Sequence, residues 1–88
     1  MQITVEISLY PLHSSYGETV LDFLQELRSH PRINIKTNQM STQVAGLFED
    51  VMQALQAAMK KTLSQEQKSA MIIKVFNENL DLDWIDFS

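Results

Sequence analysis

Residues 3–10 read ITVEISLY, and apolar and polar side chains alternate along the whole run. A period of two is typical of a β-strand, because successive side chains point to opposite faces of a sheet. This strand predicts a sheet with one apolar face that must be covered and one polar face. Pro11 is expected to end the strand, since proline supplies no backbone donor to a sheet ladder.

The segment after Pro11 has the pattern of a helix. Ser15 and Glu18 have the spacing of a capping box, in which each side chain satisfies a free backbone donor of the other residue. Apolar residues then recur at positions 20, 23, 24 and 27, which form one stripe of a helix. Pro31 disfavours helical angles at the preceding residue, so the helix is expected to end by His30.

Two short strands and a turn are expected next. Ile33 and Ile35 alternate with polar residues, and residues 40–46 (MSTQVAG) alternate less regularly, with positions 40, 42 and 44 on one face. Asn38 and Gln39 predict a tight hairpin between the two strands, because asparagine tolerates the positive φ that such turns need.

The second half of the chain predicts another helix and another strand. Apolar residues at positions 48, 51, 52, 55 and 59 form the clearest helical stripe in the sequence. Residues 62–68 are polar and read as a link. Residues 70–76 (AMIIKVF) are apolar at nearly every position, which predicts a central strand covered on both sides.

The predicted order is therefore β-α-β-β-α-β. Right-handed crossovers place both helices on one face of a four-stranded antiparallel sheet, which is the ferredoxin-like split β-α-β arrangement of the α+β class. Residues 1–78 would form this domain, and residues 79–88 an acidic C-terminal tail. The face away from the helices would be uncovered and lined by polar side chains of the first strand.

Composition narrows the possible functions. The chain has no cysteine, which excludes a disulfide scaffold and thiolate metal sites. The net charge is −4, and Lys60–Lys61 is the only adjacent basic pair, so nucleic-acid binding is disfavoured. The N-terminal residues lack the pattern of a signal peptide, and no apolar run approaches the roughly 18 residues that span a bilayer. We therefore expect a cytoplasmic protein without membrane partners.

Catalysis and metal binding find little support in the sequence. A hydrolase of the acylphosphatase type shares the predicted topology but needs an arginine in an anion-binding loop after the first strand, where residues 11–18 read PLHSSYGE. Ser14 and Ser15 near His13 are better explained as helix caps. We expect neither His13 nor His30 to have an acidic or histidine partner one helical turn away, and we therefore expect no metal site.

Residues 37–46, TNQMSTQVAG, carry six hydrogen-bonding side chains and no charge. Together with ISLYPL at 7–12 and FEDVMQAL at 48–55, this stretch resembles the YkoF-like thiamine-binding family of small ferredoxin-like proteins, and the resemblance extends from residue 3 to about residue 78. It implies a non-enzymatic protein that binds thiamine or its hydroxymethylpyrimidine part as a ligand and uses no cofactor. It also implies a homo-oligomer, a dimer or tetramer associated through sheet faces or edges.

An aminopyrimidine ring presents alternating donors and acceptors in one plane. A site for it needs fixed hydroxyl and amide groups and a surface for stacking, and a carboxylate can add a charge-assisted hydrogen bond. On this basis the expected ligand-binding residues are Glu6, Ser8, Tyr10, Asn38, Ser41 and Thr42.

Each of these residues has a plainer interpretation. Asn38 can simply shape the turn. Ser41 and Thr42 point to opposite faces of the sheet, so one of them is expected to face the helices. The polar residues of the first strand can line a subunit interface, where Glu6 would pair with Lys36.

The remaining side chains are expected to have packing roles. Met40, Met52, Met59 and Met71 occupy positions typical of a core. Trp84 in the tail is expected to pack on a groove or on a neighbouring subunit. The alternative function is an oligomeric interaction or regulatory module with no small-molecule ligand, in which the uncovered face serves only for assembly.

Overall fold

A computed structural model describes residues 1–83 of the chain. The elements are β1 (Gln2–Pro11), α1 (Tyr16–Arg28), β2 (Ile33–Thr37), β3 (Thr42–Leu47), α2 (Phe48–Leu63) and β4 (Ser69–Phe76). This is the order predicted from the alternating and helical patterns. Trp84 and the rest of the tail lie outside the described residues.

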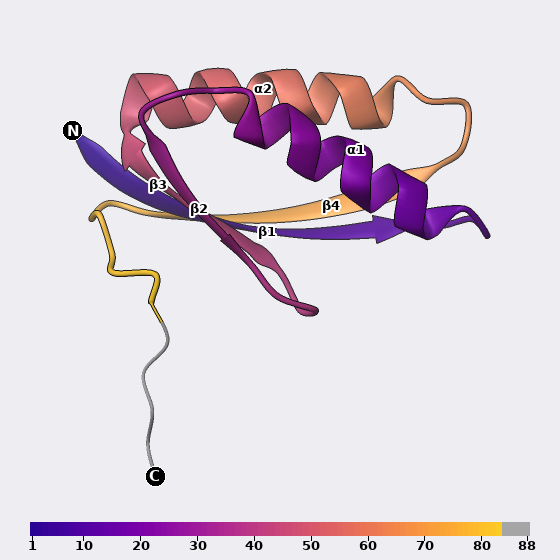
Figure 1. Cartoon of the computed structure of the whole chain (residues 1–88), viewed down its shortest axis with the longest axis horizontal. Coiled ribbons are helices and arrows are strands. Elements are labelled where there is room, and N and C mark those ends of the chain that lie inside the picture. Colours follow the sequence, from indigo (N-terminus) through magenta and orange to yellow (C-terminus); the bar gives the residue numbers. More distant parts are fainter. Residues whose placement is uncertain (84–88) are drawn as a thin grey trace, which may run out of the picture.

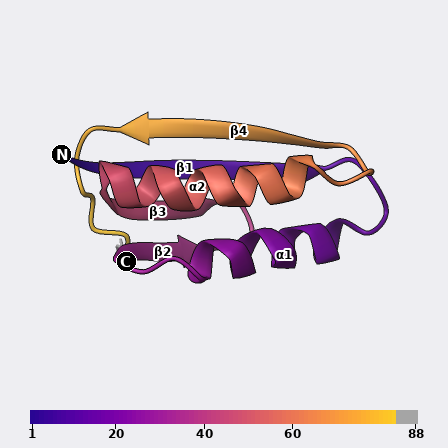
Figure 2. The same cartoon turned by 90° about the horizontal axis from the view of Figure 1, so that it is seen from above.

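The four strands form one antiparallel sheet with the order β2-β3-β1-β4. Both helices lie on the same side of this sheet, and α2 runs above β1 and β3 (Figures 1 and 2). The other side, called the open face below, carries no helix. The predicted ferredoxin-like fold is confirmed.

The core lies between the sheet and the helices. On β1 the apolar side chains Ile3, Val5 and Ile7 are at most 2% exposed, and all three point toward the helices. Val5 pairs with Val44 of β3 and with Val75 of β4, so the apolar face continues across the strands. The helices contribute the remaining fully buried apolar residues: Phe23, Leu27, Val51, Ala54, Leu55 and Ala58.

The prediction that residues 70–76 form a central strand is wrong, because β4 is an edge strand beside β1. The fold places β1 and β3 in the middle, so only these strands are flanked on both sides. Three apolar residues of β4 are consequently exposed: Ile72 by 56%, Val75 by 60% and Phe76 by 50%. Burial within residues 1–83 therefore does not explain the apolar composition of β4.

Several local expectations also need correction. Ser15 is the N-cap of α1, but its side chain makes no capping hydrogen bond, so the predicted capping box is not formed. Met40 is 84% exposed at the hairpin turn, and Met52 is 36% exposed on α2, so neither is a core residue. Met59 and Met71 do pack against the core, as predicted.

Gly46 lies near the end of β3, at a point where the backbone leaves no room for a side chain. Its φ is 158°, and a Cβ atom added there would lie 3.1 Å from the carbonyl oxygen of Arg32. It would also touch the side chains of Ile33 and Val51 at 3.4 and 3.5 Å. A side chain at position 46 would therefore require the neighbouring backbone to shift.

Neither described helix combines the length and apolar character that crossing a bilayer requires.

Candidate functional site

A row of polar side chains crosses the middle of the open face. Glu6 of β1 pairs in register with Gln43 of β3 on one side and with Lys74 of β4 on the other, and Gln43 pairs with Lys36 of β2. All four side chains point to the same face because paired residues of adjacent strands share one face. The open face therefore has a hydrogen-bonding and charged centre.

Ser41 and Lys74 contact the carboxylate of Glu6, and Gln43 holds the Ser41 hydroxyl. Ser41 Oγ donates to Glu6 Oε2 at 2.8 Å, and Gln43 Nε2 donates to Ser41 Oγ at 2.7 Å. Lys74 Nζ lies 3.3 Å from Glu6 Oε1. Each carboxylate oxygen has two lone pairs, so both can still accept a further hydrogen bond.

These contacts favour the ionised form of Glu6. The hydrogen bond from Ser41 is the main reason that the pKa of Glu6 is lowered, and the hydrogen bond and positive charge of Lys74 act in the same direction. Partial burial opposes them and is outweighed. A negative charge at the centre of the open face therefore persists to lower pH than on a free glutamate.

The hairpin turn is organised by Asn38. Its side-chain oxygen accepts hydrogen bonds from the backbone N–H groups of Met40 at 2.8 Å and Ser41 at 3.1 Å. The Asn38 backbone N–H donates to the Ser41 carbonyl at 3.0 Å. The turn is therefore centred on Gln39 and Met40, one residue later than predicted, and Asn38 acts through its side chain and not through a positive φ.

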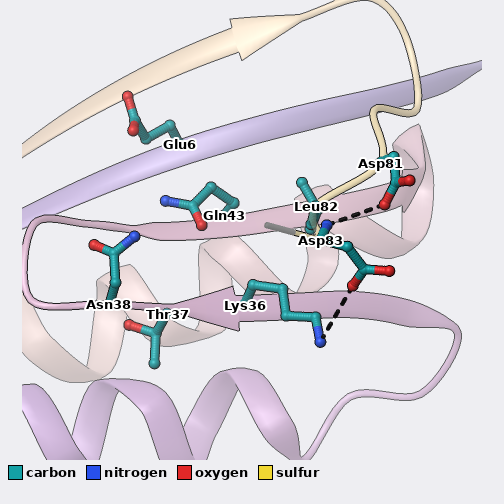
Figure 3. Close-up of a pocket in the computed structure, with 8 residues that line it drawn as sticks. All are labelled: Glu6, Lys36, Thr37, Asn38, Gln43, Asp81, Leu82 and Asp83. Carbon is teal, nitrogen blue, oxygen red and sulfur yellow. Dashed lines mark hydrogen bonds and ion pairs between the residues drawn. The ribbon is translucent and has the colours of Figure 1, made fainter. Parts of the chain in front are cut away.

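A pocket of about 430 Å³ lies between the hairpin and the C-terminal segment. Asn38 stands at one end of it, Asp81 and Asp83 at the other, and Gln43 between them (Figure 3). The lining residues are Glu6, Lys36, Thr37, Asn38, Gln43, Asp81, Leu82 and Asp83. Pockets for small ligands fall in this size range.

The six predicted ligand-binding residues are only partly brought together. Glu6 and Asn38 line the pocket, and Ser41 adjoins it through its bond to Glu6. Ser8 and Tyr10 lie further along β1 on the open face, paired with Ile72 and Ala70 of β4, and do not line the pocket.

Thr42 lies on the helix side of the sheet. It is 6% exposed, and its hydroxyl is 2.8 Å from the hydroxyl of Thr37. The expectation that Ser41 and Thr42 point to opposite faces is confirmed, and Thr42 is separated from the pocket by the sheet itself. Direct ligand contact by any of the six residues stays a prediction.

Glu6 and Lys36 do not pair with each other within the chain, and an ion pair between them across a subunit interface stays a prediction. Glu6 pairs with Lys74, whereas Lys36 Nζ lies 3.6 Å from Asp83 Oδ1. Glu6 and Lys36 do not meet within the chain because Gln43 lies between them on the sheet.

The histidines lie away from this pocket. His13 Nε2 is 3.1 Å from the hydroxyl of Thr19, and His30 Nε2 is 3.1 Å from the Glu26 carboxylate one turn earlier. The statement that His30 lacks an acidic partner at this spacing is therefore wrong. Across residues 1–83, no group of three or more His, Cys, Asp or Glu side chains is arranged to hold a metal ion.

A second hollow of about 570 Å³ runs along α2, and its apolar lining residues are Met52, Leu55, Met59 and Leu63. Its lining is more apolar than that of the first pocket, and all of it comes from α2 and the residue that follows. A small polar ligand needs convergent hydrogen-bonding groups from several elements. The pocket on the open face is therefore the better candidate site.

The profile of one protein family matches residues 2–77, which include every strand and helix. The chain belongs to the YkoF-related family. No functionally curated protein matches this YkoF-family chain.

Solved structures share the fold of this YkoF-family protein at low sequence identity. A Streptococcus pneumoniae protein has a TM-score of 0.80 at 13% identity, with 91% of this chain and 90% of that chain covered. A Thermotoga maritima protein, provisionally described as a thiamine biosynthesis/salvage protein, has a TM-score of 0.77 at 14% identity, with 93% and 91% covered. Likeness at these identities supports the fold.

Sequence reasoning missed several lining residues of the pocket. Gln43 could have been found, because it is two residues after Ser41 and therefore on the same face of the strand. Asp81, Leu82 and Asp83 carried no local signal, since nothing in an acidic tail predicts where it contacts a sheet.

Proposed function

We propose that this YkoF-family protein binds thiamine or its hydroxymethylpyrimidine part, without catalysis, in the pocket between the hairpin and the C-terminal segment. The observation that carries the proposal is the connected group of Glu6, Ser41 and Gln43 at the edge of that pocket. It offers carboxylate, hydroxyl and amide groups at fixed positions, as a planar aminopyrimidine requires.

The chemistry of the group suits such a ring. An ionised carboxylate accepts strong hydrogen bonds from an amino group, and the amide of Gln43 both donates and accepts. The family profile and the thiamine-related description of the Thermotoga maritima protein support the same ligand class.

The absence of catalysis is part of the proposal. Both histidines of the chain make contacts outside the pocket, and the pocket's lining contains carboxylates, amides, a lysine and a threonine. Such a set can bind and orient a ring. A nucleophile paired with a general base, which acyl or phosphoryl transfer requires, is not found among the lining residues.

We also propose that the chain forms a homo-oligomer, a dimer or tetramer, through its sheet. The exposed apolar side chains Tyr10, Ile72 and Phe76 all point to the open face. Exposed apolar clusters of this kind are typical of association surfaces.

One observation favours the alternative function, an interaction module without a ligand. Most polar side chains of residues 37–46 have partners within the chain: Thr37 meets Thr42, Asn38 holds the turn, and Ser41 binds Glu6. A hairpin of this kind can be rigid and polar without contacting any small molecule.

Calorimetric titration of the purified protein with thiamine and, separately, with hydroxymethylpyrimidine tests the proposal. We expect saturable binding in the micromolar range, and a Gln43→Ala variant should weaken it. Ser8→Ala is the matched control, because Ser8 lies on the same face outside the pocket. Heats equal to those of dilution, from a folded and oligomeric protein, would support the interaction module instead.

A further inference from the structure

The C-terminal segment is fixed to the sheet at its beginning. Thr4 Oγ1 donates to the Glu78 carbonyl at 2.7 Å and accepts from the Leu80 N–H at 2.8 Å, and Thr4 is 6% exposed. Asn79 Nδ2 donates to Gln2 Oε1 at 2.7 Å. One buried hydroxyl therefore uses both its donor and its acceptor to anchor residues 79–83, which we call the arm.

The arm leaves β4 and crosses under one end of the open face toward β2 (Figures 1 and 2). Among residues 1–83, the one ion pair that holds its far end is that of Asp83 and Lys36, in which the two side chains are 76% and 51% exposed. An ion pair this exposed contributes little to stability. The arm therefore has one firm attachment and one contact that another charged group can replace.

The arm brings negative charge to the pocket. The three carboxylates Glu6, Asp81 and Asp83 line it, and two lysines contact them, Lys36 at Asp83 and Lys74 at Glu6. Three negative and two positive groups leave a net charge of −1. The excess lies at the arm, because within residues 1–83 no basic side chain pairs with Asp81.

The two ends of the pocket thus differ in chemistry. Away from the arm, Asn38 is a neutral amide and the charge of Glu6 is balanced by Lys74. The arm end presents two carboxylates, Asp81 and Asp83, beside a single lysine, Lys36 (Figure 3). A ligand with a hydrogen-bonding ring at one end and a positive charge at the other matches this polarity.

We infer that the arm is a specificity-determining wall of the site: Asp81 and Asp83 bind the cationic part of the ligand, so that the protein prefers a ligand with a positively charged ring over the neutral pyrimidine alone. The inference rests on the proposed function and names the preferred member of its ligand class. When the ligand binds, its cationic group replaces Lys36 as the ion-pair partner of Asp83. Asp81 supplies a second carboxylate to the same cationic group.

The test compares thiamine, which carries a cationic thiazolium, with neutral hydroxymethylpyrimidine at mildly alkaline pH. Calorimetry on the full chain with the double variant Asp81→Asn/Asp83→Asn should show thiamine binding weakened about five- to tenfold and hydroxymethylpyrimidine binding changed less than about twofold. The thiamine effect should shrink at high salt. The double variant Asp22→Asn/Glu66→Gln is the control, since it makes the same change in net charge outside the pocket.

A second variant should change the affinity for thiamine in the opposite direction. Lys36→Gln removes the cation that competes for Asp83, so the affinity for thiamine should rise relative to the affinity for hydroxymethylpyrimidine. Equal weakening of both ligands by the aspartate variant, or no weakening of thiamine, would overturn the role of the arm while leaving the proposed function in place. Binding of neither ligand to the wild-type protein would overturn both.

Discussion

At the scale of single residues, the electrostatics of the open face depend on the carboxylate of Glu6. Its hydrogen bond from Ser41, at 2.8 Å, is the largest cause of its lowered pKa. Because this pKa is lower in the folded than in the unfolded chain, ionised Glu6 stabilises the fold above the unfolded pKa. That contribution is lost as the pH falls through the folded-state pKa.

Replacing Ser41 with alanine tests this link. In Ser41→Ala the pKa of Glu6 should rise toward its ordinary value, and the acid-side loss of stability should become shallower. A pH titration of the Glu6 side-chain carboxyl carbon by NMR measures the pKa directly. Ser8→Ala removes a hydroxyl from the same face without touching Glu6 and should leave the titration as in wild type. An unchanged Glu6 titration in Ser41→Ala would contradict the assignment.

Among the elements, the hairpin of β2 and β3 combines a structural and a proposed binding role in Asn38. Its side-chain oxygen accepts two backbone hydrogen bonds, and its amide nitrogen has no partner among residues 1–83. The oxygen therefore shapes the turn, and the nitrogen is free to meet a ligand at the pocket.

Two substitutions separate these roles. Asn38→Ala removes the oxygen and should lower the free energy of unfolding by about 0.5–1.5 kcal/mol. Asn38→Asp keeps an acceptor for the turn but loses the amide donor, so its stability should stay close to wild type while affinity for hydroxymethylpyrimidine falls. Chemical denaturation and calorimetry measure the two quantities. Wild-type affinity in Asn38→Asp would restrict Asn38 to the turn.

The elements also show how much of the fold and of the site can be predicted from the sequence. The alternation in β1 and the apolar stripes of α1 and α2 predicted the fold, because buried residues recur with the period of a strand or a helix and this recurrence is visible in the sequence. The period could not give the position of β4, since a strand with apolar residues at six of its eight positions looks the same at the centre and at the edge of a sheet. The family resemblance and the hydrogen-bonding side chains of residues 37–46 led to Glu6, Asn38 and Ser41 as candidates. They did not lead to the aspartates of the arm, whose placement depends on a distant hydroxyl at Thr4.

At the scale of the whole molecule, the sheet has one covered face and one face that the single chain leaves exposed. The arm crosses one end of the open face, near Thr4, and the opposite end carries Tyr10 and Ile72 without a cover. Tyr10 is 50% and Ile72 is 56% exposed. Under the proposed function this end is the surface on which a second copy packs, and the polar pocket lies beside it.

Two substitutions on β4 test whether a second copy packs on the open face or on another surface of the chain. Ile72 points to the open face, whereas Val75, which is 60% exposed, points to the helix side of the same strand. Ile72→Glu should place a charge in the interface and shift the protein to monomers in light scattering coupled to size exclusion. Val75→Glu should leave the assembly intact. Since both residues are exposed in the single chain, neither change should unfold it, and circular dichroism checks this.

The other outcomes identify other surfaces. Dissociation by Val75→Glu alone would place the partner against the helix side of β4 and the groove of α2, and dissociation by both variants would indicate pairing along the β4 edge. A monomeric wild-type protein would remove the homo-oligomer from the proposal. In that case the apolar side chains of β4 would need a different partner, because contacts within residues 1–83 leave them exposed.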